Sequence, residues 1–231
     1  MLTGKLRWLP LAFSLLSAIA HAQEAKLEPG KAVEREIAGG ESHAYQISLT
    51  AGQFVRFRLE QRAIDSVLNL TAPDGKQMAE VNLTDAGEPE SLALEALQAG
   101  NYQLTVRGNG TAMMRGAYRL EATAQTNASA QDLKYLAAQA LLLEAQELAR
   151  QAPKTAAQEI EKLEQSLSIW RELGAPHWAA LTLNRIGRAH FSLNQYDQAI
   201  AYFEKALAIH RGSHDRLGEA RVRLGARHST H

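Results

Sequence analysis

The segments IEKLEQSLSIWR, residues 160–171, and IAYFEKALAIHR, residues 200–211, lie forty residues apart and share one pattern. A fixed period of this size is typical of stacked helical hairpins. Such hairpins stack into a solenoid, because none of them buries its apolar face alone. The repeat therefore predicts an α-helical solenoid in the second half of the chain. The matched positions are Ile160, Leu163, Glu164, Leu167, Ile169 and Arg171 in the first segment, and Ile200, Phe203, Glu204, Leu207, Ile209 and Arg211 in the second.

Helical periodicity begins after Thr126 and continues to the end of the repeats. Ser129 followed by Asp132 predicts a capping box at the start of the first helix. That helix should end near Pro153, and Gly174 and Gly212 should end later ones, since glycine adopts the left-handed geometry of a helix end. Few residues separate consecutive helices, so neighbouring helices should be antiparallel. The expected helices after the first cover about 155–172, 177–193 and 196–211.

The first half of the chain has a period of two between about residues 27 and 125. Tyr45, Ile47 and Leu49 alternate with polar residues, as expected for a strand with one buried face. Glycine-rich and Asp-Gly turns separate the runs and supply the positive φ angles of tight reversals. This pattern predicts seven or eight short strands in an antiparallel β-sandwich. The other alternating runs cover residues 55–60, 92–94, 102–107 and 118–123.

The first residues have the plan of a secretory signal. Lys5 and Arg7 precede an apolar run over residues 8–20, and Ala20-His21-Ala22 resembles a cleavage site. We expect cleavage near Ala22 and an extracytoplasmic location, periplasmic or secreted. The alternative is a buried or membrane-anchoring N-terminal helix. No other stretch is long and apolar enough to span a bilayer, so we expect no membrane span in the mature chain.

Composition limits the chemistry that the chain can perform. The chain has 25 basic and 25 acidic residues, so no excess positive charge favours binding to nucleic acid. It has no cysteine, which rules out a cysteine nucleophile and thiolate metal sites. The expected organisation is a signal peptide over 1–22, a β-sandwich over 23–126, a linker over 127–130 and helical repeats over 131–231.

The repeats resemble the tetratricopeptide repeat (TPR) family in their spacing of large and small residues. Gly187 and Ala199 would let two helices approach each other. The pattern departs from the family at His190 and Arg211, and Gln146 and Glu147 stand where the period predicts Ile186 and Gly187. A third repeat begins at Asp215 and stops in mid-hairpin, so we expect a front piece of a longer protein or a gene that has lost its tail. The signature positions are Leu183, Ile186, Gly187, Tyr196, Ala199, Phe203 and Ala206.

The first half resembles the bacterial pre-peptidase C-terminal type of β-sandwich. The similarity covers residues 27–123 and includes Pro73-Asp74-Gly75 and Gly100-Asn101-Tyr102. A signal, such a sandwich and forty-residue repeats together resemble the N-terminal part of bacterial CHAT-domain proteins, which end in a caspase-like protease module. That module relies on a His and Cys pair, and the chain has no cysteine, so we expect no enzyme activity. The fold class is therefore multidomain β + α, an antiparallel β-sandwich followed by a TPR solenoid of two repeats and a truncated third.

The residues expected to bind a partner lie on one helix. If Ile186 and Gly187 face the partner helix, then Asn184, Arg188 and Phe191 point toward the concave side, where TPR proteins usually hold peptides. Arg188 could then grip a carboxylate of a protein or peptide partner. The alternative is a solvated helix face without a ligand.

A pair of histidines and a set of three aspartates could each hold a metal, but local structural roles explain both more simply. His210 and His214 lie four residues apart, yet they straddle Gly212 at a helix end, where histidine favours the negative dipole. Asp65, Asp74 and Asp85 are better explained as turn residues. We therefore predict no catalytic residue, no cofactor and no metal.

Three functions remain at the level of sequence. The first is an exported, non-catalytic protein-interaction scaffold. The second is the N-terminal targeting or regulatory fragment of a secreted CHAT-type protease whose catalytic domain is missing from the chain. A weaker alternative is glycan binding by the sandwich, against which the outward positions count, because they are mostly Gln, Ser, Thr, Arg and Glu.

Overall fold

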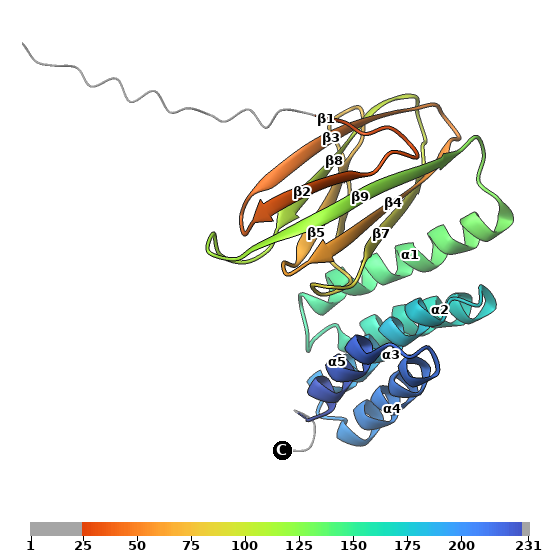
Figure 1. The fold of residues 1–231 in the computed structure, drawn as a ribbon. Helices are drawn as coiled ribbons and strands as arrows, with labels where there is room; N and C mark the ends of the chain where they lie inside the picture. The colour runs from red at the N-terminus through yellow and green to blue at the C-terminus, as the bar shows by residue number, and fades with distance from the viewer. Residues whose placement is uncertain (1–24, 228–231) are drawn as a thin grey trace, which may run out of the picture.

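The structure is a computed structural model that describes residues 25–227. Within that range nine strands precede five helices, so the predicted β-sandwich followed by a helical solenoid is confirmed (Figure 1). The predicted signal peptide lies outside the described residues. The strands are β1 (Ala25–Lys26), β2 (Val33–Ala38), β3 (Ser42–Leu49), β4 (Phe54–Arg62), β5 (Ser66–Thr71), β6 (Gln77–Val81), β7 (Glu90–Glu95), β8 (Gly100–Gly108) and β9 (Arg115–Gln125).

The strands form two sheets that face each other. One sheet has the order β1-β3-β8-β5-β6 and the other has the order β2-β9-β4-β7. Neighbouring strands are antiparallel except for β1 and β3, which pair in parallel. The alternation read from the sequence matches the burial, because Tyr45, Ile47 and Leu49 are buried in the core between the sheets. One strand register thus places the large apolar residues of β3 inside.

The helices are α1 (Ala130–Ala149), α2 (Ala156–Glu172), α3 (Pro176–Ser192), α4 (Tyr196–Gly212) and α5 (Arg216–Arg227). The predicted capping box is present, since the Ser129 side chain accepts from Asp132 N and the Asp132 carboxylate accepts from Ser129 N. Gly174 follows α2 with φ +60°, the left-handed geometry expected there. Local sequence therefore sets these helix ends.

The hairpin of α3 and α4 closes around a glycine. A Cβ atom at Gly187 would lie 2.6 Å from Cε1 of Phe203, so only glycine lets the two helices approach this closely. Phe203, Ile186 and Leu183 are buried beside it. The packing explains why small and large residues alternate across the repeat.

The forty-residue period does not extend to α1, because the connection between α1 and α2 is longer than that between α3 and α4. Residues 150–155 join α1 to α2, whereas residues 193–195 join α3 to α4. The extra residues shift α1 relative to the repeat. Gln146 therefore does not take the place of Ile186, and it faces the sandwich instead.

Two glutamines attach α1 to the edges of both sheets. Gln139 Oε1 accepts from the Ala93 amide at 2.7 Å, and its Nε2 donates to the Ala93 carbonyl at 2.9 Å. Gln146 Oε1 accepts from the Asn82 amide at 3.4 Å, and its Nε2 donates to the Glu80 carbonyl at 3.1 Å. The two glutamines are two helical turns apart and lie on one face of α1. Each side-chain amide replaces a missing neighbour strand at an edge that would otherwise be unpaired.

A cluster of rings extends this attachment into the helices. The Arg56 guanidinium of β4 lies 4.1 Å from the Tyr135 ring centroid and 3.4 Å from the Asp132 carboxylate. Tyr135 meets Trp170 of α2 edge-on at 5.0 Å, and Trp170 stacks on Trp178 of α3 at 5.4 Å. The aromatic core of the first hairpins is therefore continuous with the sandwich surface.

We predict opposite effects for two glycine substitutions in the repeats. Gly187→Ala should destabilise the chain by about 1–3 kcal/mol, because the new methyl group forces the Phe203 ring to move. Gly212→Ala is the control, since no atom lies within 4 Å of its Cβ position, and alanine should be neutral there or stabilise by up to about 1 kcal/mol. Urea denaturation of both variants measures the difference. Equal loss of stability in both would contradict the packing described.

Gln139→Leu should cost about 2–4 kcal/mol, because it leaves the buried amide and carbonyl of Ala93 without partners. The matched control is Gln165→Leu on α2, where the exposed amide donates to the Glu161 carboxylate. The control should change the free energy of unfolding by no more than about 0.5 kcal/mol. A Gln139→Leu variant as stable as the control would show that α1 does not complete the sheet edge.

Candidate functional site

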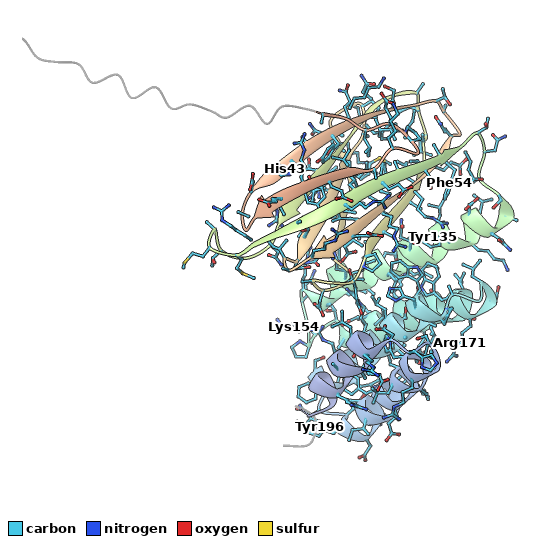
Figure 2. The ribbon with its side chains drawn as sticks, viewed as in Figure 1. His43, Phe54, Tyr135, Lys154, Arg171 and Tyr196 are labelled. Atoms are coloured by element: carbon cyan, nitrogen blue, oxygen red, sulfur yellow. The ribbon has the colours of Figure 1, made fainter. Side chains whose placement is uncertain are left out.

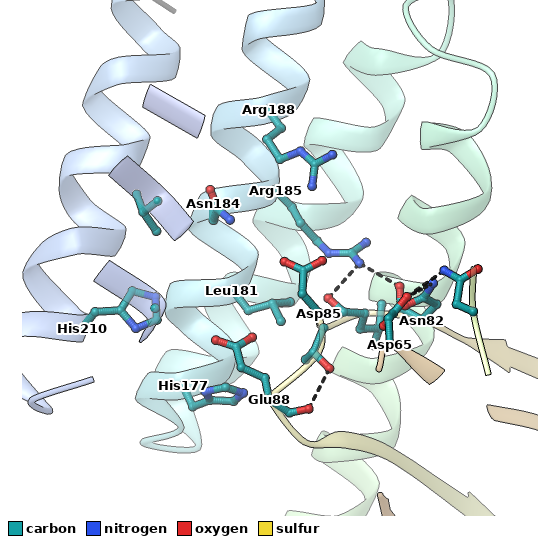
Figure 3. Close-up of a pocket in the computed structure, with 15 residues that line it drawn as sticks. Asp65, Asn82, Asp85, Glu88, His177, Leu181, Asn184, Arg185, Arg188 and His210 are labelled. Atoms are coloured by element: carbon teal, nitrogen blue, oxygen red, sulfur yellow. Dashed lines mark hydrogen bonds between the residues drawn. The ribbon is translucent and has the colours of Figure 1, made fainter. Parts of the chain in front are cut away.

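The sandwich contacts the first helix of each hairpin. We call the side of α1, α3 and α5 that is turned to the sandwich the inner face. The β6–β7 loop, residues 82–89, lies against this face and leaves a cavity of about 300 Å³ between the loop, α3 and α5 (Figure 3). This volume is at the lower end of the range for ligand pockets. The cavity is lined from the sandwich by Asp65, Asn82, Asp85 and Glu88, and from the helices by His177, Asn184, Arg185, Arg188 and Val222.

Arg185 fixes the loop to α3. Its Nη2 donates to the main-chain carbonyls of Asn82 at 3.3 Å and Leu83 at 3.0 Å (Figure 3). Burial lowers the pKa of Arg185, and the nearby carboxylate of Glu90 opposes that shift. Charged donors make stronger hydrogen bonds than neutral ones. One side chain of the solenoid thus recognises the backbone of the sandwich.

Glu90 shapes the loop from inside the sandwich. Its Oε1 accepts from the Thr84 hydroxyl at 2.9 Å and from the Thr84 amide, while the residue itself is fully buried. Burial raises the pKa of Glu90 from 4.5 to about 7, against the hydrogen bonds from Thr84 and the charge of Arg185. The loop therefore depends on a carboxyl group that titrates near neutral pH.

Polar side chains from both halves face the cavity. Within residues 25–227, Asp65 Oδ1, His177 Nε2 and Asn184 Oδ1 have no protein hydrogen-bond partner, and all three residues line the cavity. The other oxygen of Asp65 accepts from Asn109 Nδ2 at 2.7 Å. These atoms give the cavity wall hydrogen-bonding groups that a polar ligand could use.

The three residues expected to bind a partner do not lie together. Asn184 and Arg188 line the cavity, and Arg188 is exposed at its edge. Phe191 lies one turn further along α3, partly buried, with its ring 5.5 Å from that of Tyr196. The binding role of all three stays a prediction.

Sequence reasoning missed the residue that organises the site, Arg185. Its partners, Asn82 and Leu83, lie about a hundred residues away in the chain, and no spacing rule links such distant positions. Its place on α3, one position after Asn184, was a weak signal, because an arginine there reads as a solvated helix face.

The other candidates have local roles. Asp74 caps the β5–β6 turn, where its carboxylate accepts from the Lys76 amide, and it lies away from Asp65 and Asp85. His210 pairs with Asp215 at 2.9 Å across the α4–α5 turn. In the described part of the chain, no group of three or more His, Asp and Glu side chains is arranged to hold a metal ion. None of the helices over residues 25–227 has both the length and the apolar character needed to cross a membrane.

The comparison with protein families matches residues 160–212 to the tetratricopeptide repeat. This match covers α2, α3 and α4, and it confirms the TPR resemblance of the repeats. No curated protein matches the chain.

Several solved structures are similar to part of the chain. The pre-peptidase C-terminal domain of a Bacillus anthracis collagenase has 12% identity and a TM-score of 0.37, over 44% of this chain and 95% of that domain. PliG of Aeromonas hydrophila, a periplasmic inhibitor of g-type lysozyme, has 13% identity and a TM-score of 0.34, over 44% and 96%. CorA, a surface-associated copper-binding protein of Methylomicrobium album BG8, has 10% identity and a TM-score of 0.35, over 43% and 96%.

Glu90 should make stability depend on pH near neutrality. Because its pKa is about 7 in the folded chain and 4.5 as the ordinary value, its contribution is complete below 4.5 and is lost as the pH rises through 7. Glu90→Gln should remove this dependence and be more stable than the parent on the alkaline side. Urea denaturation across the pH range tests this, with Glu95→Gln on the same strand as control. A parent curve that does not fall through neutral pH would contradict the role of Glu90.

Proposed function

We propose that the chain is an exported, non-catalytic scaffold that binds a protein partner on the inner face of its tetratricopeptide repeats. The observation that carries this proposal is the position of Arg188, an exposed cation at the edge of a cavity on α3. A planar guanidinium in that place can bind a carboxylate through two parallel hydrogen bonds. The TPR match over residues 160–212 supports a role in protein interaction.

The sandwich is part of this binding surface in the proposal. It supplies one wall of the cavity through Asp65, Asp85 and Glu88. A partner on α3 therefore contacts both halves of the chain. The acidic wall opposite Arg188 would favour a partner segment that carries both signs of charge.

The polar groups around the cavity hold the β6–β7 loop in place, and this structural role supports a non-catalytic function. Arg185 holds main-chain carbonyls, and Glu90 holds the loop through Thr84. A catalytic constellation needs a nucleophile or base whose partner orients it toward a substrate. Here the titratable groups orient the protein's own loop.

Export is inferred from the first residues alone. The basic start, the apolar run and Ala20-His21-Ala22 support passage across a membrane by a cleaved signal. We place the scaffold in the periplasm or outside the cell.

Site-specific crosslinking tests the proposed surface. A photoreactive residue at Ser192, one turn beyond Arg188 on α3, should crosslink a discrete partner in periplasm or medium of the producing cell, and the same residue at exposed Ser168 on α2 should not. The partner, once identified, should bind an Arg188→Ala variant about tenfold or more weakly, as expected for loss of a charged hydrogen bond. Equal crosslinking at both positions, or unchanged affinity of Arg188→Ala, would remove the inner face as the binding surface.

A further inference from the structure

The β6–β7 loop occupies the inner face in the way that a bound segment would. It presents two successive main-chain carbonyls, those of Asn82 and Leu83, to Arg185. It also reaches α5, since a Cβ atom at Gly87 would lie 3.3 Å from Leu217 Cδ2. Extended peptide ligands are commonly held through such backbone groups, as in strand addition to a sheet edge. The protein's own loop therefore shows which chemistry this face recognises.

The two contacts between sandwich and solenoid differ in quality. At α1, both glutamines pair with a main-chain amide and a carbonyl. At α3, one side chain, Arg185, holds the loop through two main-chain carbonyls. Asp65, His177 and Asn184 line the cavity beside this contact. Because fewer hydrogen bonds join the halves at α3 than at α1, the α3 contact is the one that opens first.

The architecture allows that opening without unfolding. Strands β6 and β7 pack against α1, whereas α3 meets the sandwich through the loop. Repeats in a solenoid contact mainly their neighbours, so the later helices can swing on the first hairpin. Local openings of this kind need less free energy than global unfolding.

We infer that the β6–β7 loop is an internal ligand of the inner face, displaced by a partner segment of the same chemistry. That segment is extended and leaves two main-chain carbonyls free for Arg185. This inference rests on the proposed function and adds a second step to it: the partner first contacts the cavity between both halves, and it then competes with the protein's own loop for Arg185. Loss of Arg185 therefore opens the contact in the absence of any partner.

Distance measurements between spin labels test the opening. The chain has no cysteine, so Met113→Cys and Glu204→Cys take the labels specifically; Met113 is 92% exposed on the β8–β9 hairpin and Glu204 is exposed on α4. Arg185→Met should raise the ratio of the longer-distance population to the closed one by about tenfold or more, as the loss of charged hydrogen bonds implies. Arg171→Met, at an exposed arginine of α2, is the control and should leave the distances unchanged. Distances in Arg185→Met identical to those of the control would overturn the inference.

A peptide of residues 80–91 supplies the displacing segment. In excess over the effective concentration of the tethered loop, which is in the millimolar range, it should populate the longer distance in the parent. A peptide of scrambled sequence should not, and neither peptide should act on Arg185→Met. Equal effects of the two peptides would contradict recognition of the loop sequence by the inner face.

Circular dichroism and urea denaturation report whether each variant is folded. If Arg185→Met does not fold, the spin-label distances are measured in Arg185→Lys instead. Lysine keeps the charge and loses the geometry of the guanidinium. Arg185→Lys should then shift the population in the same direction by a smaller factor, and unchanged distances would again overturn the inference. The readout needs no partner, so its failure is distinct from failure of the crosslinking at Ser192.

Discussion

The pairing of two glutamine side chains with strand edges is the constraint on which the arrangement of the whole chain depends. A β-sandwich leaves rows of unpaired amides and carbonyls at its edges, and these groups must be hydrogen-bonded if they are buried. Gln139 and Gln146 satisfy them from one face of α1. The first helix of the solenoid is therefore also the element that closes the sandwich, and the two halves of the chain share an interface.

This shared helix determines which face of the repeats the sandwich covers. Because α1 is fixed to β6 and β7, the loop between these strands is carried onto the inner face, where Arg185 holds it. A surface that would be an open groove in an isolated solenoid becomes a cavity of about 300 Å³ with walls from both halves. In the proposed function the sandwich therefore takes part in binding and is more than a spacer.

Local patterns in the sequence predicted most of the fold. Period-two alternation located the principal strands, and the Ser129–Asp132 box and Gly174 set helix ends, because these features involve neighbouring residues only. The site was harder, since Arg185 and its two carbonyl partners come from distant segments and backbone carbonyls carry no signal in the sequence. Gln146 was read as a departure from the repeat. Its meaning depends on the strand edge it caps, which the period alone does not reveal.

Hydrogen exchange at the Ala93 amide tests the central claim most directly (Figure 2 shows the packing of side chains between sandwich and helices). This amide points away from its own sheet at an edge strand and has the Gln139 side chain as its acceptor. If α1 completes the edge, the Ala93 amide exchanges as slowly as amides in the middle of β4. Exchange as fast as that of an exposed loop amide such as Gly87 would mean that the helix is not docked on the sandwich as described.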